Sequence, residues 1–300
     1  MNSALFDIPG PKARVRHRLY AVAGVLVVIG LVAFIVYRFA FTGQFDGSKW
    51  TWLEYKTVQE SLLSALGNTL KAFALASILA LAFGAIFAAG RLSDHAIFRV
   101  PSMVIVEFFR ATPAVILMFV FYYGMQVGSP FLAVVLGLML YNGSVLAEVF
   151  RAGILSLPRG QAEAAYAVGM RKAQVMTNVL LPQALRAMLP TIISQLVVVL
   201  KDTALGYLIT YDELLRYAQY LGGIIEFGRP LVPITIVVAA MYITMCLLLS
   251  WLANYLSKRE QRSKKHIETK GPAGPTAIED GARVPASFST EITDSTPTFH

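Results

Sequence analysis

Charged residues are scarce in this sequence of 300 residues: Asp, Glu, Lys and Arg make up 15% of it, whereas hydrophobic residues make up 56%. Soluble domains carry nearer a quarter of their residues as charges, so the composition excludes an ordinary soluble protein. Cysteine is almost absent as well. Its single copy, Cys246, can form no disulfide within the chain and indicates no redox role. The composition therefore predicts a membrane protein.

Motifs for catalysis and nucleotide binding are also missing. No G-x-x-x-x-G-K-[ST] segment occurs, which excludes a P-loop that cradles ATP phosphates. No H-E-x-x-H, G-x-S-x-G or clustered Cys and His set occurs either, so the sequence predicts no enzyme, no metal site and no cofactor. The net charge of +8 does not indicate nucleic acid, because Lys and Arg stand beside helix ends rather than along a groove with interleaved aromatic residues.

Long apolar runs are what the sequence has instead. A helix needs about 20 predominantly apolar residues to cross about 30 Å of hydrocarbon, and none of the runs shows the alternation of a barrel strand. We predict an all-α, polytopic transmembrane bundle of six helices, at about 19–41, 62–90, 101–124, 130–150, 189–209 and 231–256. In the second run, a small residue at every fourth position predicts a smooth face for close helix packing. These residues are Ala72, Ala76, Ala80, Gly84 and Ala88.

Basic residues predict the orientation, since they gather before the first run, after the sixth, and in the second and fourth connections. Both termini, including a basic tail at 1–18, and the long connection at 151–189 are therefore expected on the cytoplasmic side of the cell membrane. We expect 19–41 to be a retained helix, because its uncharged run is longer than that of a usual signal peptide and no small-x-small site follows before Arg38. Residues 257–300, rich in Pro, Gly, Ser and Thr, are predicted to form a disordered cytoplasmic tail.

Polar groups inside the apolar runs mark candidate functional positions, because each costs at least about a few kcal/mol unless it faces protein or water. In "EFFRATP", Glu107 and Arg110 share a helix face, and Pro113 predicts a kink. "AEVFRAG" repeats the same spacing at Glu148 and Arg151. Each pair is either a structural ion pair or part of a gate.

The fifth run adds a polar face in "SQLVVVLKDT". Ser194 and Lys201 lie two turns apart on one side, whereas Asp202 points in a different direction from its neighbour. A substrate path and a structural network remain equally good interpretations. The candidate pathway or gating residues of the whole chain are Arg110, Thr112, Pro113, Glu148, Ser194, Lys201, Asp202 and Thr203.

The long connection between the fourth and fifth runs is predicted to contain two short helices. Pro158 and Gly160 introduce the first, and Gly169 ends it as a C-terminal glycine would. The second begins at about residue 171 and is expected to run until Pro182 interrupts it. Spacing alone favours a plain helical hairpin that links two spans.

Several motifs resemble those of one transporter family. Glu163-Ala164-Ala165, then Gly169, then Val179-Leu180-Leu181-Pro182 resemble the coupling-loop signature of ABC-importer permeases, with valine where isoleucine is commoner. The segments "RATP", "LPQALRAMLP" and "LKDTALG" are similar to those of the polar-amino-acid subfamily, although Ala111 replaces a more usual glycine. "FRAGILSLPRGQAEAAYAVGM" and the extra first helix most resemble glutamate-uptake permeases.

This resemblance implies a type I ABC-importer permease core of five helices over 62–256, with a cytoplasmic coupling loop at 151–189 and one extra N-terminal helix. It implies a non-catalytic subunit that moves a polar amino acid into the cell, and the resemblance to glutamate-uptake permeases implies that this amino acid is glutamate. The implied partners are a cytoplasmic ABC ATPase dimer, a second permease subunit (identical or sister) and an extracytoplasmic amino-acid-binding protein. The implied ATPase-coupling residues are Glu163, Ala164, Ala165, Gly169 and Pro182.

One alternative function is kept from the residues themselves. Buried ionisable residues and proline-broken helices also suit an ion-gradient-driven secondary amino-acid transporter. The coupling-loop signature speaks against it, and the internal repeat that is usual in such transporters is not found in the sequence.

Overall fold

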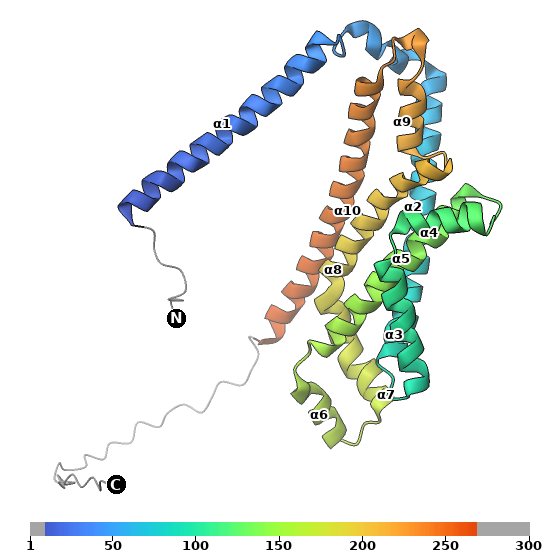
Figure 1. The fold of residues 1–300 in the computed structure, drawn as a ribbon. Coiled ribbons are helices and arrows are strands. Elements are labelled where there is room, and N and C mark those ends of the chain that lie inside the picture. Colours follow the sequence, from blue (N-terminus) through green and yellow to red (C-terminus); the bar gives the residue numbers. More distant parts are fainter. Residues whose placement is uncertain (1–9, 269–300) are drawn as a thin grey trace, which may run out of the picture. The chain divides into compact units, whose positions relative to one another are not determined.

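The computed structural model describes residues 10–268, and every regular element in this part of the chain is a helix (Figure 1). The α-helices are α1 (Pro11–Phe41), α2 (Lys56–Arg91), α3 (Ala96–Ala111), α4 (Ala114–Phe119), α5 (Pro130–Leu155), α6 (Arg159–Ala167), α7 (Lys172–Gln174), α8 (Leu181–Asp202), α9 (Leu214–Gly222) and α10 (Leu231–Glu268). Shorter 3₁₀ or π-helical elements are η1 (Gly47–Glu54), η2 (Val120–Gly124), η3 (Val175–Leu180), η4 (Thr203–Ile209) and η5 (Ile225–Phe227).

The apolar helices are long enough to cross a membrane, as the sequence predicts. Five meet the requirement of length and hydropathy alone: Lys12–Phe41, Lys56–Arg91, Pro130–Leu155, Lys172–Ile209 and Leu231–Ala253. A sixth span exists if the bent pair Ala96–Ala111 and Ala114–Gly124 is taken as one. The all-α, polytopic fold class is therefore confirmed.

The third predicted span, at 101–124, is wrong as a single continuous helix, because its two halves meet at 98°. Thr112, between them, has an extended backbone with φ −89° and ψ 123°. Pro113 imposes this conformation, since its ring disfavours a helical conformation in the residue before it. The Thr112 hydroxyl donates to the Phe108 carbonyl at 2.8 Å and so closes the end of α3. Pro113 breaks the span rather than kinking it.

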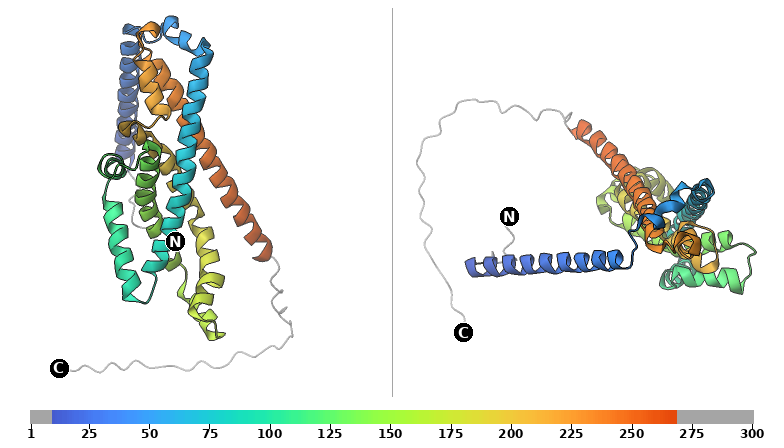
Figure 2. Two further views of the ribbon diagram at one scale, coloured as in Figure 1. Left: turned by 90° about the vertical axis from the view of Figure 1, so that its right-hand side faces the viewer. Right: turned by 90° about the horizontal axis from the view of Figure 1, so that it is seen from above.

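The small-residue face of α2 packs against α5, and the two helices run side by side in the left view of Figure 2. All five of its residues are buried. A Cβ atom added at Gly84 would lie 2.9 Å from the Leu146 Cβ and 3.1 Å from the Gly143 carbonyl oxygen. The prediction of close helix packing is confirmed, and it places α5 at the centre: 56% of its apolar window is buried, against 17% for α10 and none for α1.

The connection between α5 and α8 differs from the prediction in one respect. The first short helix forms as α6, but the second is not interrupted at Pro182: α7, η3 and α8 follow one another as one helical stretch, Lys172–Ile209. Pro182 lies in the first turn of α8, immediately after the π-helical η3. The wider turns of a π-helix absorb the missing N–H and the bulk of the ring, so the chain continues without a break.

Both ends of the described chain are more helical than predicted. α1 begins at Pro11, so the basic stretch before residue 19 is largely helical. α10 continues to Glu268, so the prediction of a disordered segment is wrong for 257–268, where Lys, Arg, Gln and Glu favour helix. Residues 1–9 and the remainder of the predicted tail, 269–300, lie outside the described residues.

Candidate functional site

α6 is a short helix whose end is set by a glycine. Gly169 has φ +81°, and its N–H donates to the Tyr166 carbonyl at 2.9 Å. The N–H of Met170 donates to the Ala165 carbonyl at 3.2 Å, which completes a Schellman motif. A Cβ atom at residue 169 would meet nothing within 4 Å, so the left-handed conformation alone favours glycine there. The predicted end of the first short helix is confirmed.

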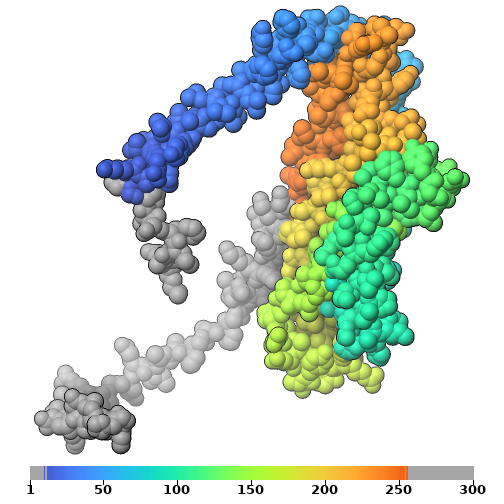
Figure 3. Space-filling view, viewed as in Figure 1, coloured from blue at the N-terminus to red at the C-terminus, as the bar shows by residue number. Residues whose placement is uncertain are grey.

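The structure divides the predicted coupling residues between two roles. Glu163, Ala164 and Gly169 are exposed, at the surface of the α6–α7 segment seen at the lower end of Figure 3. Ala165 is only 6% exposed, on the side of α6 that packs against η3. Pro182 lies apart from them, in the first turn of α8. The first group is available to a partner, whereas Ala165 joins α6 to the helix behind it.

Two further exposed residues, one in α6 and one at its C-terminal cap, were not predicted from the sequence. Tyr166 is 48% exposed and Val168 is 77% exposed, on either side of an otherwise alanine-rich surface. Large apolar side chains beside an accessible carboxylate are typical of a protein-binding surface rather than of a purely solvated face. We call Glu163, Ala164, Tyr166 and Val168 the α6 tip. The sequence feature that could have indicated this surface is the presence of two bulky residues, Tyr166 and Val168, among alanines.

Five charged side chains form a continuous chain of ion pairs across α2, α3 and α5. Arg110 contacts Glu107 at 2.8 Å, and Arg151 contacts Glu148 at 2.5 Å, as the spacing within each helix predicts. Arg91, the last residue of α2, joins the two pairs: its Nη2 lies 3.5 Å from Glu107 Oε1 and its Nη1 lies 2.9 Å from Glu148 Oε2. We call these five residues the arginine–glutamate chain.

Arg91 is the central member of this chain, and the sequence reasoning missed that role. Its side chain is only 10% exposed, against 47% for Glu107 and 24% for Glu148. Since Val106 is the one residue of α3 that is buried, these ion pairs contribute to holding α3 against α2 and α5. An arginine at the end of an apolar run is visible in the sequence, but by itself it indicates only how the helix is oriented in the membrane and not which carboxylates it contacts.

A second polar group lies inside the helical bundle, between α5 and α8. Asn142 is fully buried, and its Oδ1 accepts a hydrogen bond of 2.7 Å from Gln195 Nε2. The Asp202 carboxylate lies beside the same Asn142 amide, and Gln195 and Asp202 are two turns apart on one side of α8. The Nδ2 of Asn142 is inaccessible to solvent and forms no hydrogen bond of good geometry within the described residues, although the Asp202 carboxylate lies beside it. We call Asn142, Gln195 and Asp202 the inner polar cluster.

The other predicted residues of α8 are arranged differently. Ser194 and the buried Thr203 donate to backbone carbonyls of their own helix, four and three residues earlier, at 2.9 and 2.7 Å. Lys201 faces a separate cavity of about 420 Å³ that is also lined by α10 residues, including Thr235 and Tyr242. Within the described residues Lys201 forms no ion pair, with Asp202 or any other carboxylate. The structure thus separates Lys201 from the inner polar cluster.

Comparison with known proteins assigns this architecture to a family. Residues 80–262 match the family described as "Binding-protein-dependent transport system inner membrane component". The glutamate transport system permease protein of Corynebacterium glutamicum is 42% identical over 243 residues, which are 78% of this chain and 88% of that protein. The glutamate/aspartate import permease protein of Escherichia coli O157:H7 is 32% identical over 213 residues, which cover 66% of this chain and 92% of that protein.

Solved structures give the same assignment. The fold matches that of an amino acid ABC transporter with a TM-score of 0.63 and 30% identity, over 69% of this chain and 98% of that one. A methionine ABC transporter in inward-facing form matches in fold, with a TM-score of 0.59 and 19% identity, over 68% of this chain and 98% of that one. These relatives do not support the ion-gradient-driven alternative. The chain therefore belongs to the inner-membrane components of binding-protein-dependent transport systems, as the permease subunit of an amino-acid ABC importer.

Proposed function

We propose that this permease imports glutamate and that ATP hydrolysis in a separate dimer of ATPase subunits drives the transport. The names of the two glutamate-related relatives support the substrate. An extracytoplasmic binding protein delivers the amino acid, and a second permease subunit, identical or a sister, completes the membrane part. The chain itself has a transport role and no catalytic one.

The α6 tip is the proposed contact with the ATPase. The observation that carries this proposal is the accessible Glu163 carboxylate beside the exposed Tyr166 and Val168, on a helix whose opposite side is packed through Ala165. That packing matters for coupling, because α6 contacts η3 and η3 continues directly into α8. A displacement of α6 by the ATPase is thereby passed to the helix that carries Gln195 and Asp202.

The inner polar cluster is the proposed contribution to the translocation path. A buried amide without a well-formed hydrogen bond needs an explanation in a membrane protein, because an incompletely paired polar group in an apolar environment is costly. Asn142 and the neighbouring Asp202 carboxylate suit the polar groups of a substrate that passes through the bundle. The proposed gating region is the break at Thr112 and Pro113 together with the nearby arginine–glutamate chain, which includes Arg110 and Glu148. Secondary candidates are Ser194 and Lys201 on α8 and Thr203 at the start of η4.

The proposed orientation follows the basic residues and places both termini and the α6 tip in the cytoplasm. Membrane vesicles that contain the permease, its ATPase and the binding protein test the proposed function as a whole. We expect labelled glutamate to be taken up only with ATP and binding protein, and uptake to continue when a protonophore collapses the ion gradient. Uptake driven by an ion gradient without ATP would contradict the proposal.

The coupling proposal has its own test in Glu163→Arg. Truncating one partner of an interface charge pair costs about 2–5 kcal/mol, and reversing the charge adds repulsion. We therefore expect the variant to lose most of the co-purifying ATPase, or to hydrolyse ATP without uptake. Glu226→Arg, an equally exposed glutamate on η5, is the matched control and should behave as the wild type. Normal ATPase association with normal uptake in Glu163→Arg would remove α6 as the coupling element.

A further inference from the structure

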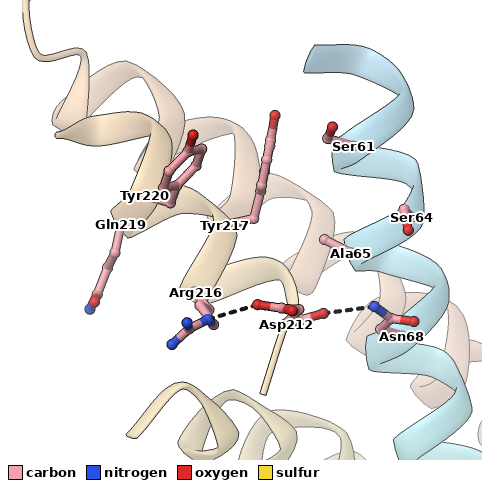
Figure 4. Close-up of a pocket in the computed structure, with 9 residues that line it drawn as sticks. All are labelled: Ser61, Ser64, Ala65, Asn68, Asp212, Arg216, Tyr217, Gln219 and Tyr220. Atoms are coloured by element: carbon pink, nitrogen blue, oxygen red, sulfur yellow. Dashed lines mark hydrogen bonds and ion pairs between the residues drawn. The ribbon is translucent and has the colours of Figure 1, made fainter. Parts of the chain in front are cut away.

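A cavity of about 650 Å³ lies between residues 61–68 of α2 and the helix α9, in the part of α2 that is farther from Arg91. Figure 4 shows Ser61, Ser64 and Asn68 on α2 facing α9 across it, with Asp212 between the two helices. Such a volume is in the range of small-molecule sites. We call this cavity the outer vestibule.

Polar side chains line both walls of the outer vestibule, beside the more apolar Ala65, Tyr217 and Tyr220. Ser61, Ser64 and Asn68 recur at three and four residues and so share one face of α2. Across from them, Asp212 and Arg216 place a carboxylate and a guanidinium one helical turn apart. A surface of this kind facing lipid would be costly. The cavity is therefore a place for water or for a polar ligand.

The charged pair in the cavity leaves binding capacity on both partners. Asp212 Oδ1 lies 2.7 Å from Arg216 Nε, and the two side chains are 83% and 38% exposed. A guanidinium carries five N–H donors, and a carboxylate has two acceptor oxygens. This contact uses one nitrogen and one oxygen, so Arg216 can still bind an external carboxylate while Asp212 accepts from an external ammonium group. A neighbouring cation and anion match the two ends of a zwitterion.

α9 is held in place independently of this pair. Glu213 is fully buried and caps the helix, since its carboxylate accepts from the N–H groups of Leu215 and Arg216 at 2.8 and 2.7 Å. The same carboxylate accepts from the Tyr242 hydroxyl at 2.8 Å, which fastens α9 to α10. On the α2 side, Asn68 Nδ2 donates to the Asp212 carbonyl at 2.9 Å. The backbone that carries Asp212 and Arg216 is thus positioned by groups that do not need their side chains.

We propose that the outer vestibule binds the α-ammonium and α-carboxylate groups of a free amino acid, with Asp212 and Arg216 as the respective partners. The site lies apart from the inner polar cluster and recognises what all amino acids share, so it selects for the zwitterion rather than for a particular side chain. The identity of the ligand as a transported amino acid rests on the proposed function above.

Thermal unfolding of the purified permease–ATPase complex, without binding protein, tests this site. We expect L-glutamate and L-glutamine to raise the unfolding temperature of the wild type, and N-acetyl-L-glutamate, which lacks the ammonium group, to have no effect. In Arg216→Gln and Asp212→Asn the concentration for a half-maximal shift should rise at least about tenfold, because one charge-assisted contact is lost. Arg216→Lys, which keeps the cation, should retain part of the shift.

Arg229→Gln and Glu226→Gln are the matched controls, since both residues are exposed and neither lines the cavity. The double variant D212R with R216D exchanges the two charges. It keeps an ion pair in the cavity but exchanges the positions of the positive and negative groups that would bind the ligand. The proposal is overturned if this double variant responds to glutamate like the wild type, or if Arg216→Gln and Asp212→Asn keep the full shift. Glutamate uptake into vesicles by the wild type is measured separately. If the wild type does not take up glutamate, the proposed function is wrong. If it does, but Arg216→Gln and Asp212→Asn keep the full thermal shift, only the proposed binding site in the outer vestibule is wrong.

Discussion

Arg91 shows how much one side chain can decide in this fold. It is the common partner of Glu107 and Glu148, which belong to two different helices. A guanidinium presents several donors in a fixed plane and can serve two carboxylates at once, whereas a lysine ammonium is a single point charge. The link between α2, α3 and α5 therefore depends on the residue being arginine and not merely basic.

Arg91→Ala should destabilise the protein by about 1–3 kcal/mol, because two carboxylates lose a partner near the bundle interior. Arg91→Lys should recover part of this loss. The measurement is the unfolding temperature of the purified permease together with its amount in the membrane. Lys56→Ala is the control, since its ion pair with Glu60 is exposed on both sides, at 88% and 63%, and should change stability little. An Arg91→Ala variant as stable as Lys56→Ala would show that the arginine–glutamate chain does not stabilise the packing of α2, α3 and α5.

The local part of this site is predictable from sequence, and the rest is not. Three-residue spacing predicts the pairs within α3 and within α5, and both are found. The ion pairs of Arg91 with Glu107 and Glu148 require three helices to meet in space. The spacing of residues within a single helix does not predict such a contact. Asn142 and Gln195 were missed for the same reason: the partner of each lies on another helix, which the sequence around either residue does not reveal.

Proline acts oppositely in two elements of this chain, which limits what a sequence can predict about helices. Pro113 ends a helix and turns the chain by 98°, whereas Pro182 is accommodated within a continuous helical stretch. The difference lies in the residues before them: Thr112 is extended, and η3 has the wide turns of a π-helix. The small-residue face of α2, in contrast, was predictable from sequence. Small residues at every fourth position lie on one side of a helix, and a smooth side is what close helix packing requires.

The packing of α2 against α5 predicts opposite effects for two glycines of one helix. Gly84→Ala should destabilise by about 1–3 kcal/mol, because the added Cβ would press on Leu146 and on backbone atoms of α5. Gly67→Ala, where a Cβ meets nothing within 4 Å, should stabilise by about 0.5–1 kcal/mol through helix propensity. Unfolding temperatures of the two purified variants provide the measurement. Equal shifts in the same direction would contradict close packing at Gly84.

α6 offers a similar comparison for backbone conformation. Gly169→Val forces a β-branched side chain into the left-handed region, which costs at least about 1–2 kcal/mol and disrupts the Schellman motif. We expect less ATPase to co-purify with this variant, although its amount in the membrane is unchanged. Gly160→Val, also in open space but without a positive φ, should keep normal ATPase binding. If both variants retain the ATPase, the geometry of the α6 end is irrelevant to coupling.

At the scale of the whole molecule, one end of the bundle carries the α6 tip and the arginine–glutamate chain, and the start of α2 carries the outer vestibule. The sequence predicted the division into apolar runs, because membrane thickness sets their length, but it did not predict that the third run is divided into two helices that meet at 98°. It did not predict the cavity between α2 and α9, since Ser61 and Arg216 are far apart in the chain. This cavity exists only because α2 and α9 lie next to each other, and neither helix forms it alone.

The proposed orientation predicts which faces are accessible from each side. Because Cys246 is the single cysteine, Cys246→Ser provides a background without thiols. In that background Ser3→Cys should react with a membrane-impermeant maleimide only after the cytoplasmic side is opened, whereas Lys49→Cys in η1 should react from outside in intact cells. The reverse pattern would invert the orientation and place the α6 tip away from any cytoplasmic ATPase.

The arginine–glutamate chain also has an electrical consequence. Its three guanidinium groups and two carboxylates leave a net charge of +1 near one boundary of the bilayer. A charge moved across the full bilayer exchanges about 2.3 kcal/mol with a membrane voltage of 100 mV. In the proposed orientation, an interior-negative voltage draws this cluster toward the cytoplasm and opposes any outward displacement of α3. We therefore expect transport by the proposed ATP-driven permease to depend on the voltage of the membrane as well.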